Sequence, residues 1–312
     1  MTVADPVSQF FILQGFILVP FALGAWFRGR LLRPDLWSRR LIRLNLVTIE
    51  PVLGLWVIWG LGASLTTVGL LPVFGFGVVL IGLLLGWLVQ RAFGYATRES
   101  RATFIISASL ANHGFTLGGF VCYLLLGEAG LGLSAVFVLY FYAYIYLVVF
   151  PFAGRAGSGG QPVRLLALFL SPNYLPFYAA LVGAALLLAG VERPDWPLPL
   201  QEILYVALVF YYFSLGLTFR GPGLWSHRRA ILLLSAIKFL AVPAIVALVL
   251  RLFPLAPIAA RVVTIEATMP AAVYSVVTAV LFELDRDLAA ALFVGTSVLF
   301  LVLVMPVIFF FG

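Results

Sequence analysis

The sequence interrupts a long apolar segment with residues 107–119, which read SASLANHGFTLGG. The glycines weaken a helix at this point, and the side chains of Asn112 and His113 need hydrogen-bond partners once they leave water. A second apolar segment carries residues 266–270, which read EATMP. Its proline has no N–H to donate and restricts the residue before it. We therefore predict that one helix is interrupted near Asn112 and another near Pro270.

The composition around these stretches is typical of a membrane protein. Of 312 residues, 63% are hydrophobic and only 10% are charged, a balance far from that of soluble domains. A helix needs about 20 apolar residues to cross about 30 Å of hydrocarbon, so the chain has room for about ten spans. The expected fold class is all-α, as a polytopic membrane protein.

Apolar runs bounded by Arg, Pro or Gly predict ten transmembrane helices, and a Gly- and Ser-rich linker, residues 154–161, divides them into five and five. Residues 1–156 and 157–312 are therefore expected to be two five-helix repeats of one integral membrane domain. The spans are predicted at about residues 8–27, 44–63, 68–91, 102–126, 131–153, 174–190, 200–219, 229–252, 258–282 and 287–311.

The basic residues alternate between the two ends of these spans, as expected when cytoplasmic loops collect Lys and Arg. Fifteen arginines fall on the side predicted to be cytoplasmic. Three fall on the other side, namely Arg193, Arg251 and Arg261, and Lys238 falls within a span. Both termini are therefore expected outside the cytoplasm, with the protein in the plasma (inner) membrane. Because the net charge of +7 is scattered, no nucleic-acid partner is predicted. The side predicted to be cytoplasmic holds Arg28, Arg30, Arg33, Arg39, Arg40, Arg43, Arg91, Arg98, Arg101, Arg155, Arg164, Arg220, Arg228, Arg229 and Arg286.

An odd number of spans in each half predicts that the halves enter the membrane in opposite orientations, as in inverted-repeat transporters. An offset of 157 residues aligns Asn112 with Met269. Spans four and nine would then be interrupted at equivalent points. Interrupted helices offer unpaired N–H and C=O groups to a solute, whereas the alternative is a Gly-lined packing face with an ordinary proline kink. The substrate-binding residues expected from the first interpretation are Asn112, His113, Gly114, Thr116, Gly118, Gly119, Met269 and Pro270.

Few ionisable side chains fall inside the spans. Glu50, Lys238 and Glu266 are the expected coupling or ion-binding residues, because a charged group costs about 2.5 to 3.5 kcal/mol at mid-span and should have a function or a partner. We expect Lys238 and Glu266 to pair, so that a proton or solute competes for the carboxylate. A purely structural pair is the alternative. Glu50 either lines the entrance or extends toward the surface, and His113 either relays protons or is a hydrogen-bonded fixture.

Motifs for familiar enzymes are absent. The sequence contains no G-x-x-x-x-G-K-[ST], no H-E-x-x-H and no G-x-S-x-G, so nucleotide-driven pumping and hydrolytic chemistry have no support. We expect no enzyme activity, no metal and no cofactor, apart from Na⁺ or H⁺ as alternative coupling ions.

Two stretches resemble the auxin efflux carrier (PIN-like) family. Residues 111–115 through 126–128 are similar to its fourth-helix N-T-G-F region, and residues 267–273 through 288–291 to its ninth-helix A-x-M-P segment. Residues 215–217 and Pro51 match the end of its seventh helix and its second-helix proline. The resemblance implies ten helices, crossing of the interrupted helices four and nine, and export of an organic anion without ATP.

The sequence departs from that family at two places. Gly118 and Gly119 replace its usual fourth-helix proline, and Glu266 is unusual for its ninth helix. With an acidic residue at this position, the predicted ninth helix resembles that of the bile acid:sodium symporters of the wider superfamily, whose ninth helix contributes to sodium binding. Sodium coupling therefore stays open. The alternative is that the positive charge of Lys238 substitutes for that of the sodium ion.

The function predicted is a secondary transporter that moves a small organic solute, an organic anion, by alternating access, either proton- or sodium-coupled or as a uniporter. The partners expected are the anion and the lipid bilayer, with a homodimer as the candidate assembly. A bile acid:sodium symporter-like uptake carrier is one alternative. Another is a membrane-embedded lipid-modifying enzyme, which predicts clustered polar side chains at the membrane surface; only Asp285 and Asp287 fit.

Overall fold

The computed structural model describes residues 6–62, 65–93, 95, 97–157, 172–219 and 223–311. Half of the linker expected at 154–161, residues 158–161, therefore lies outside the described residues, as do Arg164 and Arg220. Residues 154–156 of that expected linker instead form the end of a helix. Within the described ranges the fold is all-helical, and extended pairing is limited to one isolated bridge.

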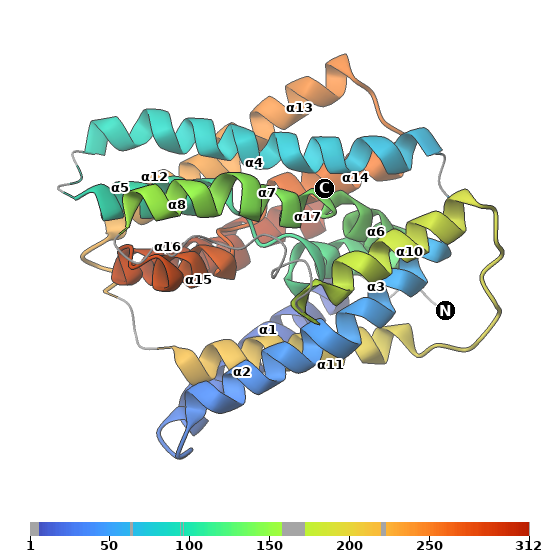
Figure 1. The fold of residues 1–312 in the computed structure, drawn as a ribbon, viewed down its shortest axis with the longest axis horizontal. Coiled ribbons are helices and arrows are strands. Elements are labelled where there is room, and N and C mark those ends of the chain that lie inside the picture. Colours follow the sequence, from blue (N-terminus) through green and yellow to red (C-terminus); the bar gives the residue numbers. More distant parts are fainter. Residues whose placement is uncertain are drawn as a thin grey trace.

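The helices form two bundles, which Figure 1 separates clearly. In the smaller bundle, α1 packs along α11 and α3 along α10. The helix α2 continues without a break into α3 through a π-helical turn. The members are α1 (Pro6–Arg28), α2 (Pro34–Leu44), the π turn Asn45–Ile49, α3 (Glu50–Trp59), α10 (Leu175–Leu188) and α11 (Leu200–Thr218).

The larger bundle contains the remaining helices, with α4 covering α5 and α6 packing on α14. Short 3₁₀ turns also occur at Gly114–Thr116 and Pro172–Tyr174. The members are α4 (Leu65–Phe93), α5 (Arg98–Ser109), α6 (Gly118–Phe137), α7 (Tyr140–Tyr144), α8 (Phe150–Ala156), α12 (Arg228–Ala236), α13 (Val242–Leu252), α14 (Pro257–Ala267), α15 (Val273–Leu281), α16 (Arg286–Leu299) and α17 (Met305–Phe311).

Four described helices contain a π turn just before a proline. The turns Asn45–Ile49, Ile145–Val149, Ile237–Ala241 and Phe300–Val304 precede Pro51, Pro151, Pro243 and Pro306 by one residue. Proline cannot donate to the carbonyl four residues earlier, and a wider turn lets the helix continue past that missing bond. Pro20 and Pro72 lie inside helices without such a turn, so proline permits the wider turn but does not require it.

The interruptions predicted near Asn112 and Pro270 are both present. α5 ends at Ser109 and α14 at Ala267, and an extended segment follows each. The two segments pair in antiparallel fashion: the Asn112 N–H donates to the Pro270 carbonyl at 2.8 Å, and the Ala272 N–H to the Leu110 carbonyl at 3.1 Å. The chain thereby crosses itself inside the larger bundle.

Seven helical segments of the described chain are long and apolar enough to cross a membrane. This count is below the ten predicted, and the interruptions account for part of the difference because they cut two predicted spans into short pieces. One of the seven, Gly118–Phe137, bends at Gly127, whose φ of 69° is left-handed. The bend lies where the sequence predicts a turn between spans four and five. The ten-span inverted repeat itself stays a prediction.

The second span differs from its prediction. The Arg-rich stretch before residue 44 was expected to be a loop, but it forms α2, and the span runs over Pro34–Trp59. Ser38 is buried on α2 and donates a hydrogen bond to the Ser214 carbonyl of α11 at 3.1 Å. The arginines lie on the exposed face of the same helix, so an amphipathic pattern explains the difference.

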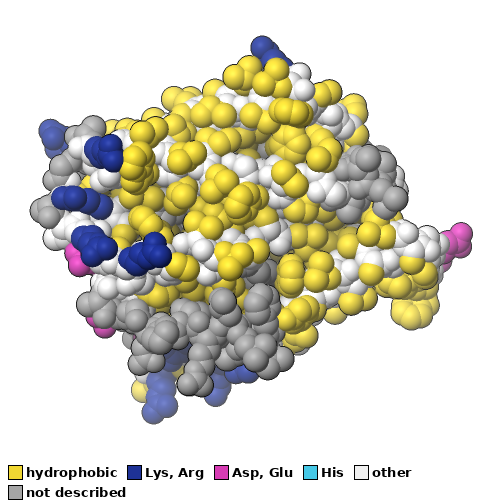
Figure 2. Space-filling model, turned by 45° about the horizontal axis from the view of Figure 1, so that its top comes forward, with side chains coloured by type: hydrophobic (Ala, Val, Ile, Leu, Met, Phe, Trp, Pro, Cys, Tyr) yellow, Lys and Arg dark blue, Asp and Glu magenta, His cyan; other side chains and the backbone are white. Residues whose placement is uncertain are grey.

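Hydrophobic side chains cover the middle of the molecular surface in Figure 2, and most of the visible Lys and Arg side chains gather toward one edge. The starts of α5, α12 and α16 and the end of α8 lie at this edge, which is one end of the bundles (Figure 1). We call it the basic end.

Close packing of α1 on α11 depends on two glycines. A Cβ added at Gly24 would fall onto the Phe213 carbonyl oxygen and lie 3.0 Å from the Gly216 Cα. A Cβ at Gly216 would in turn fall onto the Phe21 carbonyl oxygen. The two helices therefore touch through their backbones, as small residues allow in membranes.

Replacing Gly24 by Ala should destabilise the protein by about 1 to 3 kcal/mol, because the added methyl group forces the two helices apart. Gly15→Ala is the matched control on the same helix, where nothing lies within 4 Å of the added Cβ. Thermal unfolding in detergent should show a lower midpoint for Gly24→Ala only. Equal midpoints for the two variants would contradict the backbone contact.

Candidate functional site

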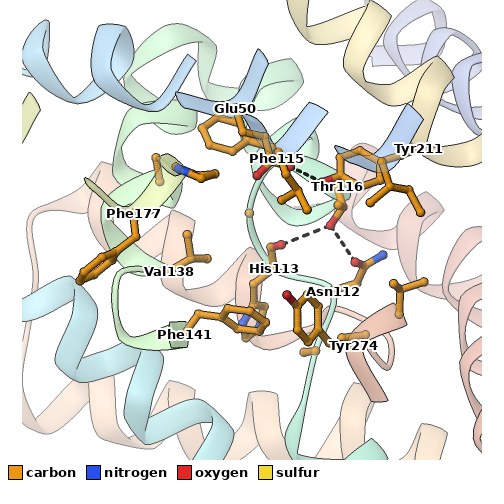
Figure 3. Close-up of a pocket in the computed structure, with 18 of the residues that line it drawn as sticks. Glu50, Asn112, His113, Phe115, Thr116, Val138, Phe141, Phe177, Tyr211 and Tyr274 are labelled. Atoms are coloured by element: carbon orange, nitrogen blue, oxygen red, sulfur yellow. Dashed lines mark hydrogen bonds between the residues drawn. The ribbon is translucent and has the colours of Figure 1, made fainter. Parts of the chain in front are cut away.

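A cavity of about 310 Å³ lies between the two bundles, next to the crossing (Figure 3). Because both bundles contribute to its wall, relative movement of the bundles would reshape it. From the smaller bundle it is lined by Ile42, Leu46, Glu50, Pro176, Phe177, Ala180, Tyr211, Tyr212 and Leu215. From the larger bundle it is lined by residues 111–116, Ala135, Val138, Leu139, Phe141, residues 272–274 and Val277.

Asn112 presents hydrogen-bond donors to this cavity. The Thr116 hydroxyl donates to Asn112 Oδ1 at 2.7 Å, which fixes the amide. The Asn112 Nδ2 makes no hydrogen bond to any other described residue, and Asn112 lines the cavity. Gly114 makes the tight turn between Asn112 and Thr116 possible, because its φ of 74° is left-handed, a region that glycine adopts readily. The amide N–H groups are thus available to a bound molecule.

The start of α15 faces the same cavity. Ala272 is its N-cap residue, and Val273 and Tyr274 form its first turn; all three line the cavity. The first N–H groups of a helix have no partner within the helix, and this end carries a partial positive charge. The Ala272 N–H is already bonded to the Leu110 carbonyl, so the electrostatic contribution comes from the residues that follow.

His113 is held by both ring nitrogens. Its Nε2 lies 2.9 Å from the Glu266 backbone carbonyl, and its Nδ1 lies 2.7 Å from the Tyr140 hydroxyl. A carbonyl can only accept, so Nε2 carries the proton and Nδ1 accepts from Tyr140 in the neutral ring. Although His113 lines the cavity, these bonds support the hydrogen-bonded fixture rather than the proton relay.

Lys238 and Glu266 do not form the expected pair. Lys238 is 3% exposed, and its Nζ donates to the carbonyls of Leu110 at 2.9 Å and Ser109 at 3.3 Å. These carbonyls end the half-helix α5, where a cation compensates the partial negative charge. No ion pair joins Lys238 to Glu266; within the described residues the ion pair found is Arg193 with Glu128.

Glu266 meets the opposite kind of helix end. It is fully buried, and its Oε1 accepts a hydrogen bond from the Ser134 hydroxyl at 2.5 Å. A Cβ added at Gly118 would fall onto this carboxylate, so the group lies directly against the start of α6. A carboxylate is favoured at a helix N-terminus. Each charge therefore faces a helix end of opposite partial charge, and this explains why the two do not meet.

Glu50 lies in the cavity wall. It is the first residue of α3, is 8% exposed, and accepts a hydrogen bond from the Tyr211 hydroxyl of α11. The carboxylate is therefore buried rather than extended to the surface. The neighbouring Tyr212 hydroxyl donates to the Thr116 carbonyl at 3.1 Å, which connects the smaller bundle to the interrupted segment of the larger one.

The structure brings some of the predicted site residues together and separates others. Asn112, His113, Gly114, Thr116 and Glu50 line the cavity. The other predicted residues lie outside the cavity wall and support the crossing. Gly118 allows close approach of the Glu266 carboxylate, and Gly119 that of the Gly114 backbone. Met269 is buried in the core, the Pro270 carbonyl accepts from the Asn112 N–H, and Lys238 and Glu266 lie at helix ends.

The aromatic wall was not predicted. Phe177, Tyr211 and Tyr274 all line the cavity, yet they come from three separate helices. The adjacent tyrosines in the middle of α11 were the available signal, because a hydroxyl in an apolar span needs a partner.

Residues 161–309 match the model of a family described as membrane transport protein. The match supports a membrane transporter. That family includes auxin efflux carriers, and its members are transporters rather than enzymes. The matched region covers just under half of the chain, including Tyr211, Lys238 and the α14–α15 interruption, and together with the apolar helices it supports an integral membrane protein. No curated protein matches the chain.

Replacing Lys238 by Met should destabilise the protein by about 1.5 to 3 kcal/mol, because two buried carbonyls would lose a charged donor. Ser235→Ala is the matched control: Ser235 is buried on α12, and its hydroxyl has no partner among the described residues. Thermal unfolding in detergent should show a lower midpoint for Lys238→Met and a nearly unchanged midpoint for Ser235→Ala. A midpoint unaffected by Lys238→Met would show that the carbonyls find other donors.

Proposed function

We propose that the protein is a secondary transporter that carries a small organic anion across the membrane, with the cavity at the crossing as its binding site. The observation that carries this proposal is the antiparallel pairing of two interrupted segments beside a cavity shared by two bundles. Discontinuous helices that meet near the middle of the membrane are the usual substrate site of secondary transporters. The family match over residues 161–309 supports transport.

The polarity of the cavity favours an amphipathic anion. The free N–H groups of Asn112 and the start of α15 provide donors and a positive potential. Phe115, Phe177 and Phe141 supply an apolar wall for the rest of the molecule. A volume of about 310 Å³ is at the small end of ligand sites. An aryl or alkyl carboxylate of modest size meets all three conditions.

The inverted repeat of ten helices is part of this proposal. Interruptions occur at similar points of residues 1–156 and 157–312, and the π turns before Pro151 and Pro306 lie close to the ends of the same two ranges. Two halves of opposite orientation would allow one bundle to move against the other around a fixed crossing, giving alternating access.

At the end opposite the basic end, contacts around Arg193 join the two bundles. Its guanidinium pairs with Glu128, which follows the Gly127 bend, and donates to the Trp56 carbonyl at 3.1 Å. It also lies over the Trp56 ring, 4.8 Å from its centroid. If Lys- and Arg-rich loops are cytoplasmic, both termini lie outside the cytoplasm, and the Arg193 contacts join the bundles on the extracytoplasmic side. The membrane proposed is the plasma (inner) membrane.

The position of Lys238 argues against sodium coupling. A sodium ion in this type of fold would need carbonyl ligands freed by an interrupted helix, and the ammonium of Lys238 already binds two of them. We therefore disfavour the bile acid:sodium symporter-like alternative. The lipid-modifying enzyme is also disfavoured, because Asp285 caps α16 through Leu288 and accepts a hydrogen bond from Ser100.

Filling the cavity should stop transport. Ala180→Phe places a ring in the wall of α10. Uptake of radiolabelled phenylacetate, benzoate and hexanoate into proteoliposomes should fall at least roughly tenfold, because the added ring occupies volume that the solute needs in a small site. Leu181→Phe, at the next position and 43% exposed, should retain uptake. If both variants transport equally well, the solute does not pass through this cavity.

Replacing external Na⁺ by K⁺ should leave the uptake rate of the same carboxylates unchanged within about twofold, because the protein's own ammonium occupies the carbonyls at the end of α5. The rates are measured in proteoliposomes with matched ionic strength. Accumulation that requires an inward Na⁺ gradient would contradict the role given to Lys238.

A further inference from the structure

Glu50 places a carboxylate inside a site proposed to bind anions. It begins α3 directly after the π turn Asn45–Ile49, and it lines the cavity together with Tyr211, the hydroxyl of which donates to it (Figure 3). The exposed fraction of Glu50 is 8%, so bulk water does little to screen its charge. This group plays no part in the crossing and needs its own explanation.

No basic side chain balances this carboxylate within the described part of the cavity wall. The titratable groups facing the cavity are Tyr211 and Tyr212 from α11, Tyr274 from α15, and His113 from the interrupted segment, whereas α10 contributes none. Both nitrogens of His113 are engaged elsewhere. Lys238 lies outside the cavity wall and is bonded to carbonyls. An ionised Glu50 would therefore leave the cavity with an uncompensated negative charge.

Such a charge would oppose an organic anion strongly. A cavity of about 310 Å³ brings a bound carboxylate close to Glu50. Two unit charges separated by about 7 Å repel, at an effective dielectric constant of about 20, strongly enough to weaken binding roughly 50-fold. A proton on Glu50 removes this repulsion and turns the group into a hydrogen-bond donor. The Tyr211 hydroxyl can still donate to the other oxygen.

We propose that Glu50 is the proton-binding site of the transporter: the cavity takes up an organic anion together with a proton on Glu50, and the two cross the membrane as a neutral pair. This inference rests on the proposed anion transport and names its coupling ion. The proton adds to one Glu50 carboxylate oxygen as the anion binds and leaves from the same oxygen when the anion is released. The transport cycle is therefore a proton symport.

Phenylacetate binding to the purified full-length protein tests this proposal by calorimetry at about pH 5.5 and about pH 7.5, where the ligand is ionised throughout. For the wild type, affinity should fall at least roughly tenfold at the higher pH, with uptake of about one proton per bound ligand, because protonation of Glu50 and anion binding are linked. Glu50→Gln should bind phenylacetate at both pH values with equal affinity and without proton uptake.

Two further variants complete the design. Glu202→Gln removes an exposed carboxylate at the start of α11 and should behave as the wild type. Tyr211→Phe removes the donor that favours ionised Glu50, so phenylacetate binding should persist to higher pH than in the wild type. A purely structural role of Glu50 would not move the pH midpoint in this direction. Tyr211→Phe also provides an answer if Glu50→Gln does not fold.

Three results would overturn the proposal. The first is wild-type affinity that is independent of pH while uptake continues; anion transport would then stand without Glu50 as its proton site. The second is a wild type that binds protonated benzylamine together with a folded Glu50→Gln variant that binds neither benzylamine nor phenylacetate. The cavity would then be a cation site that needs the charge of Glu50. The third is no carboxylate binding or uptake at either pH, which would remove the proposed function itself.

Discussion

The antiparallel pairing of two interrupted segments is the constraint on which the rest of the structure depends. Inside a bilayer a helix cannot simply stop, because freed N–H and C=O groups have no water to bond. Here each interruption supplies partners for the other: Asn112 donates to Pro270, and Ala272 donates to Leu110. Thr296 of α16 accepts from the Ala271 N–H at 3.2 Å. Neither segment could be satisfied in this way if the other were a continuous helix.

The same constraint explains where the buried charges lie. Two interruptions create four helix ends, and three of them meet a side chain that suits their partial charge: Lys238 at the end of α5, Glu266 at the start of α6, and His113 at the end of α14. The fourth end, the start of α15, lines the cavity. The positive potential of the site therefore comes from the one of these four helix ends that no described side chain caps.

Sequence reasoning located the interruptions because glycine and proline act locally, and local effects can be read from neighbouring residues. It failed to place the partners of Lys238 and Glu266, since two opposite charges at mid-span suggest a pair, whereas the helix ends that bind them exist only after the chain crosses. The cavity wall shows the same limit. Asn112 and Thr116 were found from their own segment, but Tyr211 and Phe177 reach the site through the packing of α11 and α10.

The π turn before Pro51 also changes which way the second span faces. One extra residue in a turn rotates everything beyond it by about 100° relative to a regular helix. Ser38 faces α11 before the turn, while Glu50 opens onto the cavity and Leu53 and Val57 are buried after it. A periodicity search with one fixed phase across residues 34–59 would average two distinct faces into none. Shortening this segment by one residue would thus redirect the carboxylate while leaving the composition of the span almost intact.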